Sequence, residues 1–394
     1  MSSQIEPAGI PTPSADATEW ARRANQAARS VTRSFGRRLL FLPGTHIGAV
    51  TLPSDTLRSL SGPWHYWWQA HYVDCLVDAG RRELAGKTKF DGDSRPSAGR
   101  LASRLVTTIR LRNLLRFVND YYDDMAWLAL ATLRLEKLAE ETKKPGRRRN
   151  AYVQKCLTLQ FDSASTDHLG GGTFWSTKRD FKNTPATAPV SLYYARTGHT
   201  ERAQHLVNWL NSKLLHPERG LYQDGLRISN GEVVVDGAIY TYNQGPVLGA
   251  LLELGGDENL RRAALLVDAV ERELTLPGTR VIRGDGTGDG GLFTGILLRY
   301  LALAARDVRL SATTREKATS LVYGTAEAFW AGRRVSTGSA GRGTPAIVFS
   351  FEPQRPASET YPVGAAVELS TQLQGWMALE AAASITSNAS SPGN

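Results

Sequence analysis

The chain has 394 residues, of which 41% are hydrophobic, and it carries a formal net charge of +9. This length and composition allow a large buried core. Length alone suggests two or three domains, although a closed repetitive fold often forms one domain that is longer than usual. The positive charge raises nucleic acid or an anionic surface as possible partners. Most of it lies in residues 95–116 and in the run Lys143, Lys144, Arg147, Arg148 and Arg149.

These basic stretches have no helix-turn-helix, RNP or zinc-finger pattern near them. Basic runs of this kind are typical of solvated helix faces and turns. We therefore interpret them as surface and expect no nucleic-acid partner.

Cys75 and Cys156 both fall in helical patterns, where a buried, reduced thiol is common, and no disulfide is implied. The first twenty residues lack a basic stretch followed by an apolar one, and no window reaches membrane-spanning length. The chain as given is therefore predicted to be cytoplasmic, without a membrane span, and secreted only if a leader was trimmed. A monomer is expected.

Residues 1–14 and 386–394 are rich in Ser, Pro, Ala and Gly and are predicted to be disordered. Residues 15–385 have a continuous pattern and are predicted to form a single catalytic domain. Apolar spacing and capping signals predict about twelve helices. They lie near 15–40, 62–84, 97–117, 121–142, 148–163, 185–197, 199–215, 240–254, 257–275, 289–306, 311–332 and 361–384.

The predicted helices alternate in character. Four segments, at 67–77, 123–135, 242–254 and 291–305, are apolar almost all round, whereas five of the others carry charged faces. A helix that is apolar on every side must be enclosed by other helices. Six repeats of this alternation predict an all-α (α/α)6 toroidal barrel, although an open superhelix of helix pairs fits nearly as well. The lack of a fixed sequence period favours the closed ring.

One small β-hairpin is also expected. The residues around Asn230-Gly231 alternate between apolar and polar, and this dipeptide is a strong signal for a two-residue hairpin turn.

Carboxylates crowd the start of the helix predicted at 121–142, where Asp120, Asp123 and Asp124 lie among tyrosines. One of them could cap the helix while the others complement its dipole. One cap, however, needs only one carboxylate. Adjacent carboxylates in a partly apolar surrounding repel each other, so the pKa of one should rise. An acid and a base would then coexist at neutral pH, as glycosidic bond cleavage requires.

The surroundings of this pair suit a sugar. Flat rings, which stack on the C–H faces of sugars, recur in several segments. Amides that can both donate and accept hydrogen bonds lie beside the rings, although each could equally be a satisfied core amide. The rings are Trp64, Tyr66, Trp67, Trp68, Tyr121, Tyr122, Phe174, Trp175, Tyr240 and Tyr242, and the amides are Gln69, Asn183, Asn243 and Gln244.

Four motifs resemble glycoside hydrolase family 76 in their order and spacing. They are YYDDMAWLALA at 121–131, FKN at 181–183, YTYNQG at 240–245, and GDGGLF with the following GI and RYL at 288–301. The similarity runs from about residue 60 to 380. It implies an (α/α)6 barrel that cleaves α-1,6-linked mannan with retention of configuration. We expect no cofactor and no metal.

By this resemblance Asp123 is the nucleophile that forms a mannosyl-enzyme intermediate, and Asp124 is the general acid that later acts as base. Spacing alone does not assign these roles. Endo action is expected. The resemblance also implies a substrate cleft lined by Trp68, Gln69, Trp175, Asn183, Tyr242, Asn243, Gln244 and Asp289, to which we add Tyr122 beside the catalytic pair.

Two other patterns point elsewhere. The glycine-rich run at 286–291 matches a dinucleotide fingerprint literally, but no alternating βαβ pattern follows, and the glycines can equally form a tight turn that lets Asp285 or Asp289 face a cleft. His71, Asp74 and Asp78 have a spacing that could hold a metal on one helix face, yet a core histidine is the favoured interpretation.

Three further functions stay open at this point. A covalent intermediate could be intercepted by a sugar hydroxyl, which would make the protein a mannan transglycosylase. The aspartates could merely cap a helix in a non-catalytic glycan-binding or scaffolding protein. A sugar epimerase on a similar barrel is also conceivable, but such chemistry usually recruits histidines, and the seven histidines form no evident site.

Overall fold

The computed structural model describes residues 13–53, 62–144, 147–335 and 346–386. Within them lie twelve long helices, as predicted, and one helix of a single turn. The long helices are α1 (Pro13–Phe35), α3 (Tyr66–Gly86), α4 (Ala98–Arg112), α5 (Tyr122–Glu141), α6 (Arg147–Ala164), α7 (Thr184–Arg196), α8 (Thr200–Lys213), α9 (Thr241–Leu254), α10 (Gly256–Leu274), α11 (Phe293–Arg306), α12 (Ala312–Ala331) and α14 (Leu369–Thr386), and the short one is α13 (Ala357–Thr360).

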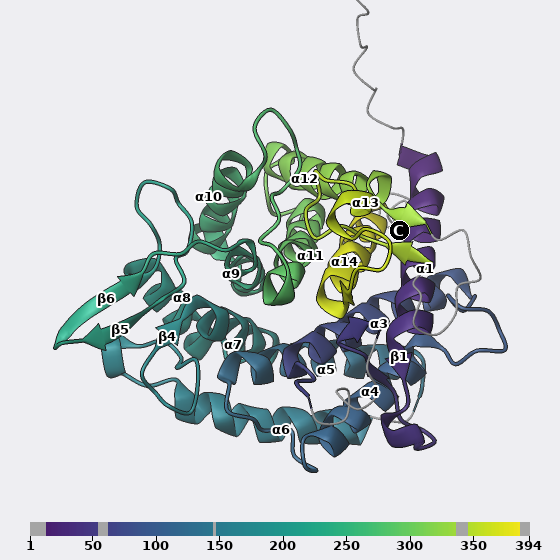
Figure 1. Ribbon diagram of the computed structural model, residues 1–394. Helices are drawn as coiled ribbons and strands as arrows, with labels where there is room; N and C mark the ends of the chain where they lie inside the picture. Colours follow the sequence, from purple (N-terminus) through teal and green to yellow (C-terminus); the bar gives the residue numbers. More distant parts are fainter. Residues whose placement is uncertain (1–12, 54–61, 145–146, 336–345, 387–394) are drawn as a thin grey trace, which may run out of the picture.

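The long helices form two concentric rings (Figure 1). In the inner ring α3, α5, α7, α9, α11 and α14 each pack against the next, and α14 packs back against α3. The outer ring consists of α1, α4, α6, α8, α10 and α12, each packed against one or two inner helices. The chain thus alternates between outer and inner helices six times and closes on itself. The predicted (α/α)6 barrel is confirmed, and the open superhelix is excluded.

The two rings differ in how their helices are buried. In the inner helix α7 every residue from Thr184 to Tyr194 is buried. In the outer helix α10 the buried residues recur at helical spacing on one face, as with Asn259, Ala263 and Leu266. An inner helix meets neighbours on all sides, whereas an outer helix meets them on one. This contrast explains why the apolar and charged segments alternate along the sequence.

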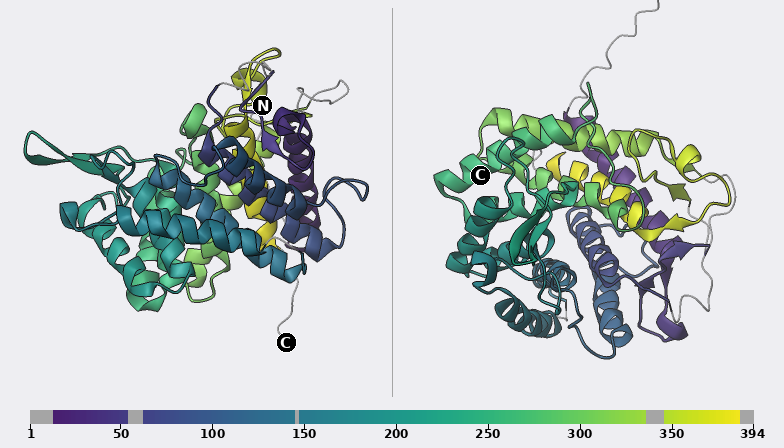
Figure 2. Two further views of the ribbon diagram at one scale, coloured as in Figure 1. Left: turned by 90° about the horizontal axis from the view of Figure 1, so that it is seen from below. Right: turned by 60° about the vertical axis from the view of Figure 1, so that its left-hand side comes forward.

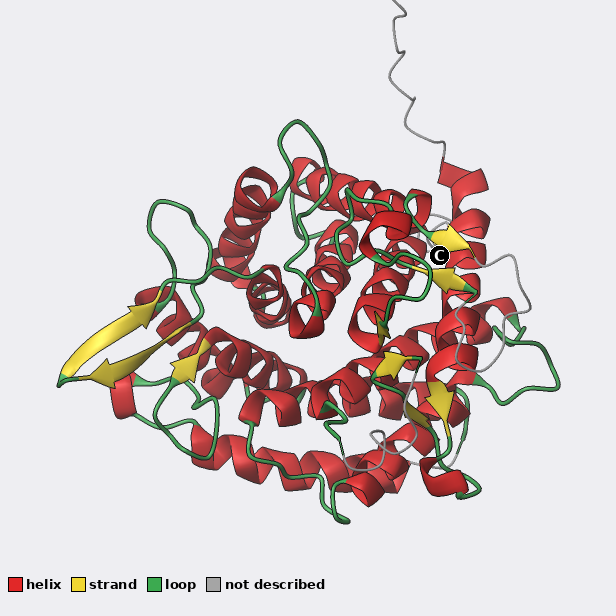
Figure 3. Ribbon diagram, viewed as in Figure 1, coloured by secondary structure: helices red, strands yellow, loops and turns green. Residues whose placement is uncertain are grey.

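The predicted hairpin is formed by β5 (Gly225–Ser229) and β6 (Glu232–Asp236), with Leu226 opposite Val235. Asn230 and Gly231 have φ values of 52° and 82°, the positive values that this two-residue turn requires. A third strand, β4 (Lys182–Asn183), pairs with β5. The hairpin projects beyond the helices in the left-hand view of Figure 2, and its strands stand out in Figure 3.

Three two-residue strand pairs were not predicted, and two of them move helix boundaries. β1 (Gly36–Arg37) pairs with β2 (Ile47–Gly48), so the first helix ends at Phe35 and not near residue 40. β3 (Thr51–Leu52) pairs with β9 (Val367–Glu368), so the last helix begins at Leu369 and not at residue 361. Pairs this short leave no period that sequence reasoning could detect. The third pair joins β7 (Arg334–Val335) to β8 (Ile347–Val348).

The predicted disordered ends lie almost wholly outside the described residues. Helix α1 already begins at Pro13, within the segment 1–14, and α14 ends at Thr386. Cys75 and Cys156 are free thiols, in agreement with the prediction of no disulfide. Across the described ranges, no helix has both the length and the apolar character of a membrane span.

Because each inner helix follows an outer one, all six inner helices run in the same direction through the barrel. Their first turns gather at one rim, which we call the N-terminal rim, and their last turns gather at the opposite rim. The first turns of five inner helices, α3 to α11, surround one cavity. A second cavity lies at the opposite rim, where the last turns meet.

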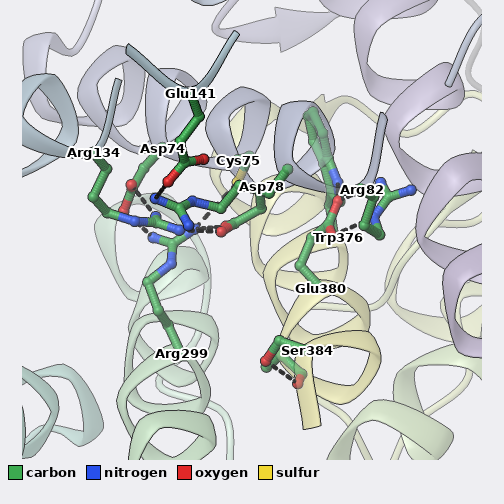
Figure 4. A network of polar contacts seen from close by, with 12 residues as sticks. Asp74, Cys75, Asp78, Arg82, Arg134, Glu141, Arg299, Trp376, Glu380 and Ser384 are labelled. Carbon is green, nitrogen blue, oxygen red and sulfur yellow. Dashed lines mark hydrogen bonds and ion pairs between the residues drawn. The ribbon is translucent and has the colours of Figure 1, made fainter. Parts of the chain in front are cut away.

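A ring of four charged side chains is buried near that opposite rim (Figure 4). Arg134 of α5 and Arg299 of α11 each pair with both Asp74 and Asp78 of α3. Although burial opposes it, the two guanidinium groups lower the pKa of Asp78 to about 2. The ring ties three inner helices together.

The metal interpretation of His71, Asp74 and Asp78 fails for a physical reason, because both carboxylates are engaged by arginines. His71 is buried against the rings of Trp67 and Trp127, and burial lowers its pKa well below the usual value. In the part of the chain that the structure describes, no group of three or more His, Cys, Asp or Glu side chains is placed to hold a metal ion.

Candidate active site

The cavity at the N-terminal rim has a volume of about 610 Å³. Residues from the starts of successive inner helices form its wall, so segments more than 200 positions apart meet there. Carboxylates and aromatic rings dominate the lining. The lining residues are His65, Tyr66, Trp67, Tyr121, Asp123, Asp124, Trp127, Trp175, Phe181, Asn183, Asp224, Tyr240, Tyr242, Asp285, Asp289, Gly290 and Phe293.

Asp123 and Asp124 lie in the first turn of α5, at the wall of this cavity. The residue that caps α5 is Tyr121, whose side chain makes no capping hydrogen bond. Asp123 Oδ1 accepts the backbone N–H of Asp124 at 2.9 Å, and its Oδ2 accepts the indole N–H of Trp175 at 3.0 Å. Asp124 Oδ2 accepts the side-chain N–H of Asn119 at 2.7 Å. Neither aspartate occupies the capping position that the alternative interpretation requires.

Both carboxyl groups hold their protons more tightly than ordinary aspartates. Burial raises the pKa of Asp123 to about 7, against the lowering effect of its hydrogen bonds, and the charge of Asp224 adds to the rise. Burial raises the pKa of Asp124 well above its ordinary value, and repulsion by Asp123 adds to it, while the Asn119 amide opposes it. The two groups titrate as a pair, which can hold one proton and one negative charge near neutral pH.

Three more carboxylates surround the pair. Burial raises the pKa of Asp224 to about 6, although the Asn243 amide donates to it at 3.3 Å. Asp285 accepts the backbone N–H and the hydroxyl of Thr241, and burial raises its pKa. Asp289 accepts two indole N–H groups, described below. A site this rich in acceptors suits a neutral ligand with many hydroxyl donors.

Aromatic rings form the walls on both sides of the carboxylates. Tyr242 stacks on Phe293 with centroids 3.8 Å apart and planes 16° apart, and Tyr121 packs against Trp175 with centroids 5.1 Å apart. Trp175 is 37% exposed and Tyr240 36%, so both rings present an open surface at the rim. Rings exposed beside hydrogen-bond acceptors are what a sugar, with its apolar C–H faces and polar edges, can contact.

Of the nine residues predicted to bind substrate, four line the cavity: Trp175, Asn183, Tyr242 and Asp289. Asn183 also caps α7, because its Oδ1 accepts the backbone N–H of Ala186 at 3.1 Å. Its side chain therefore has one fixed orientation at the cavity wall.

Three predicted residues lie directly behind the wall and support residues that line it. Trp68 donates its indole N–H to Asp289 at 2.8 Å, beside the indole of Trp67 at 3.1 Å. Asn243 donates to the carboxylate of Asp224, as noted above. Tyr122 is buried, and its backbone N–H donates to the carbonyl of Trp175 at 2.8 Å.

Gln69 and Gln244 are placed in the core and not in the cleft that was predicted for them. The Gln69 amide bonds to the backbone of Gly48 and Trp64, and the Gln244 amide bonds to the backbone of Tyr222 and Tyr240. Neither residue lines the cavity. Each amide serves to hold a loop against its helix, which is the alternative that the sequence left open.

Sequence reasoning missed Asp224, His65 and Phe181, all of which line the cavity. Asp224 directly precedes strand β5, so the hairpin that was predicted does end at the cleft. A carboxylate at the base of a predicted hairpin was the available signal. His65 has a positive φ of 48° at the start of α3, which no sequence pattern indicated.

The glycine-rich run at 286–291 forms a tight turn, as the structural interpretation of it proposed. Residues Gly288–Leu292 make a short 3-10 helix that leads into α11. A Cβ atom on Gly290 would lie 2.1 Å from the carbonyl oxygen of Asp285, so the turn admits only glycine there. Asp285, directly before the run, and Asp289, within it, both line the cavity.

The contact between Trp175 and Asp123 gives a testable pH dependence. Trp175→Phe removes the indole N–H that stabilises ionised Asp123, so the pKa of Asp123 rises. If the ionised form of Asp123 is the active one, the acidic limb of kcat/KM moves to higher pH by about one unit. Tyr121→Phe is the matched control, since it also changes a ring of this wall but removes no bond to Asp123. A pH profile that is the same in the two variants would contradict this assignment.

A closed helical barrel whose rim holds a coupled carboxylate pair between aromatic walls is the arrangement of a glycosidase. The chain matches the family described as Glycosyl hydrolase family 76 over residues 19–388, and it belongs to that family. The expected family resemblance is thereby confirmed. No curated protein matches the chain.

Solved structures extend this comparison. The GH76A alpha-1,6-mannanase from Salegentibacter sp. HEL1_6 is 27% identical, with a TM-score of 0.75 over 94% of this chain and 100% of that one. An inactive variant of it with two consecutively numbered aspartates changed to asparagine, in complex with alpha-1,6-mannotriose, gives 27% identity and a TM-score of 0.74 over 94% of this chain and 100% of that one. Dfg5 from Chaetomium thermophilum in complex with glucosamine shares the fold at 17% identity, with a TM-score of 0.69 over 95% of this chain and 92% of that one.

Proposed function

We propose that this glycosidase is a retaining, endo-acting α-1,6-mannanase that works through Asp123 and Asp124. The observation that carries the proposal is the coupled pair itself, with one carboxyl held by Trp175 and the other by Asn119. The similar mannanase from Salegentibacter supports the choice of substrate, since its inactive double variant binds α-1,6-mannotriose.

In this proposal Asp123 attacks the anomeric carbon while Asp124 protonates the leaving oxygen. The indole N–H of Trp175 favours the ionised form of Asp123, as a nucleophile requires. Repulsion by that charge keeps the proton on Asp124, as a general acid requires. Once the leaving chain departs, Asp124 is ionised and can take a proton from the water that releases the mannosyl group.

The aromatic rings at the rim support endo action. Tyr121 and Trp175 lie on the α5 side of the pair, and Tyr240 and Tyr242 lie at the start of α9. A polymer that crosses the rim would find rings on both sides of the cleavage point. Aromatic surfaces of this kind contact successive sugar units of a chain.

Product analysis on linear and on branched α-1,6-mannan tests this proposal. We expect the linear polymer to yield a ladder of oligosaccharides early in the reaction, with release of free mannose only late. Mannose as the sole early product would contradict endo action. Products longer than an oligosaccharide substrate would show that an acceptor sugar replaces water, which is the transglycosylase alternative.

No release from linear α-1,6-mannan at any pH between about 5 and 9 would overturn the choice of substrate. In that case binding of the intact polymer by the wild type and by Asp123→Asn alike would favour the non-catalytic glycan-binding alternative.

A further inference from the structure

A third cavity, of about 880 Å³, lies between inner and outer helices of the barrel, away from the N-terminal rim. It is enclosed by the last turns of the inner helices α3 and α5 and the first turns of the outer helices α4 and α6, which lie side by side in Figure 1. We call it the basic cavity. Its lining residues are Gly80, Glu83, Leu84, Lys89, Ser94, Arg95, Pro96, Ser97, Gly99, Arg100, Ser103, Arg104, Leu135, Leu138, Ala139, Thr142, Lys144, Arg149 and Asn150.

The charge of this lining is strongly one-sided. Glu83 is its one acidic residue, and both of its carboxylate oxygens already accept backbone N–H groups, from Phe90 at 3.1 Å and from Ala98 at 3.0 Å. Among the described residues, none of the lining cations forms an ion pair with a carboxylate. These six cations are Lys89, Arg95, Arg100, Arg104, Lys144 and Arg149.

Arg149 is the most firmly held of these cations. Its Nη1 donates to the carbonyl and hydroxyl oxygens of Ser103 at 2.8 and 3.0 Å and to the hydroxyl of Thr107 at 3.0 Å. Its Nη2 donates to Asn150 Oδ1 at 3.1 Å. All of these partners are neutral, so they fix the direction of the guanidinium group and leave its charge uncompensated.

Two further donors, one on Arg149 itself and one on the next residue, lack partners. The Nε of Arg149 and the Nδ2 of Asn150 are buried and make no hydrogen bond within the described residues. Buried donors are nearly always paired in folded proteins, so this pair marks a place where an acceptor is missing.

The neighbouring arginines increase the local positive potential. Burial lowers the pKa of Arg104, and the charges of Arg100 and Arg38 lower it further. Burial also lowers the pKa of Arg149. An unpaired, partly buried cation costs free energy, and a bound anion would remove that cost.

The chemistry of the lining narrows the class of anion. Several guanidinium groups that converge on one cavity match a phosphoryl group, which carries more than one charge and offers several acceptor oxygens. Leu84, Leu135 and Leu138 add an apolar wall that could cover the organic part of a ligand. The volume is in the range of sites that take small organic molecules.

The helix ends do not by themselves make this site. Two amides at the start of α4 are already used, since Ala98 N–H donates to Glu83 and Arg100 N–H donates to Ser97. The positive end of the α4 dipole adds to the potential, but the ligand contacts must come from side chains.

We propose that the basic cavity is a binding site for a phosphate-bearing ligand, with Arg149 and Arg104 as its main contacts. The two basic stretches that the sequence presents as solvated surface, 95–116 and 143–149, contribute all of the cations except Lys89 and meet here. This site is separate from the carboxylate cleft and does not depend on the function proposed for it. The phosphoryl group could belong to a free sugar phosphate or to a lipid headgroup.

Calorimetry with pyrophosphate and with mannose 6-phosphate, at constant ionic strength, tests the proposal for free ligands. Flotation with vesicles that contain phosphatidylinositol, against neutral phosphatidylcholine vesicles, tests it for a headgroup. We expect wild-type protein to bind at least one of these probes, and Arg149→Gln to weaken that binding by about tenfold or more. Mannose without phosphate should not bind to this cavity.

The matched control is Arg148→Gln, which removes the same charge from an exposed neighbour that does not line the cavity. It should leave the affinity within about twofold. Arg104→Gln provides a second test in case Arg149→Gln fails to fold, and it should also weaken binding. Equal losses in the Arg148 and Arg149 variants would show nonspecific attraction and overturn the proposal, as would the absence of binding to every probe.

Discussion

Asp123→Asn and Asp124→Asn are each expected to lower kcat/KM on linear α-1,6-mannan by about 1,000-fold or more. An amide can neither attack the anomeric carbon as a carboxylate does nor donate a carboxyl proton. Asp120→Asn is the matched control, because Asp120 is three or four positions away in the same acidic segment but does not line the cavity. It should retain activity within about threefold.

A substrate with a good leaving group separates the two roles. An aryl α-mannoside whose phenolate leaves without protonation should restore the first step in Asp124→Asn, since that step no longer needs an acid. It should not restore Asp123→Asn, which lacks the nucleophile. Recovery in the Asp123 variant alone would reverse the proposed roles, and full activity of either variant on mannan would remove the pair from the mechanism.

The Asp123→Asn substitution should also stabilise the fold at alkaline pH. The pKa of Asp123 is about 7 in the folded protein, above the ordinary value of 3.8. A carboxyl with a raised pKa stabilises the folded state below its ordinary pKa, and this contribution is lost as pH rises toward the folded value. Asp123→Asn should therefore have a higher Tm than wild type at pH 8 and a similar one near pH 4. A lower Tm at pH 8 would contradict the raised pKa.

Arg299→Met is expected to destabilise the protein by about 3–5 kcal/mol, the largest effect on stability that we predict. It leaves Asp74 and Asp78 buried with Arg134 as their one remaining partner in the ring that Figure 4 shows. Removing one partner of a buried ion pair leaves the other charge buried without compensation, which strongly destabilises the folded state. The intact pair, by contrast, adds little to the free energy of unfolding. Denaturant unfolding measures the difference in free energy.

Arg306→Met is the matched control for this substitution. Arg306 lies two turns further along α11 and lines the same cavity, but its Nε donates to the carbonyl of Ala302 and to no carboxylate. It should cost about 1 kcal/mol or less. Equal losses for the two variants would show that the ring of Asp74, Asp78, Arg134 and Arg299 has no special role.

The fold could be predicted from the sequence because the burial of each helix determines which of its positions are apolar. An inner helix such as α7 has no face in contact with solvent, so its sequence is apolar on every side, whereas the outer helix α10 has a charged face. The Asn230-Gly231 turn was equally clear, since few dipeptides adopt its positive φ values. The two-residue strands left no such trace, so the ends of α1 and α14 were misplaced.

The site was predictable only in part. Crowded carboxylates led to Asp123 and Asp124, and the glycine turn led to Asp289. An amide in sequence looks the same whether it meets a ligand or the backbone, and so Gln69 and Gln244 were assigned to the cleft although they hold loops in the core. Asp224 reaches the cavity through the tertiary fold of the hairpin, and its position directly before the predicted strand was the one local signal for it.

The basic stretches show the same limit. Each one alone resembles a solvated helix face. The structure brings the first turns of α4 and α6 together, so that Arg104 and Arg149 face one cavity. Charges that are unremarkable along the sequence become a cluster only when two helices are placed side by side.

The central claim is that Asp123 and Asp124 cleave α-1,6-linked mannan with retention of configuration. Its most direct test is the anomeric form of the first product, followed by ¹H NMR during hydrolysis of a linear α-1,6-manno-oligosaccharide. We predict that the α-anomer of the new reducing end appears first and converts to the equilibrium mixture afterwards. A β-anomer as the first product, or no product at all, would contradict the claim.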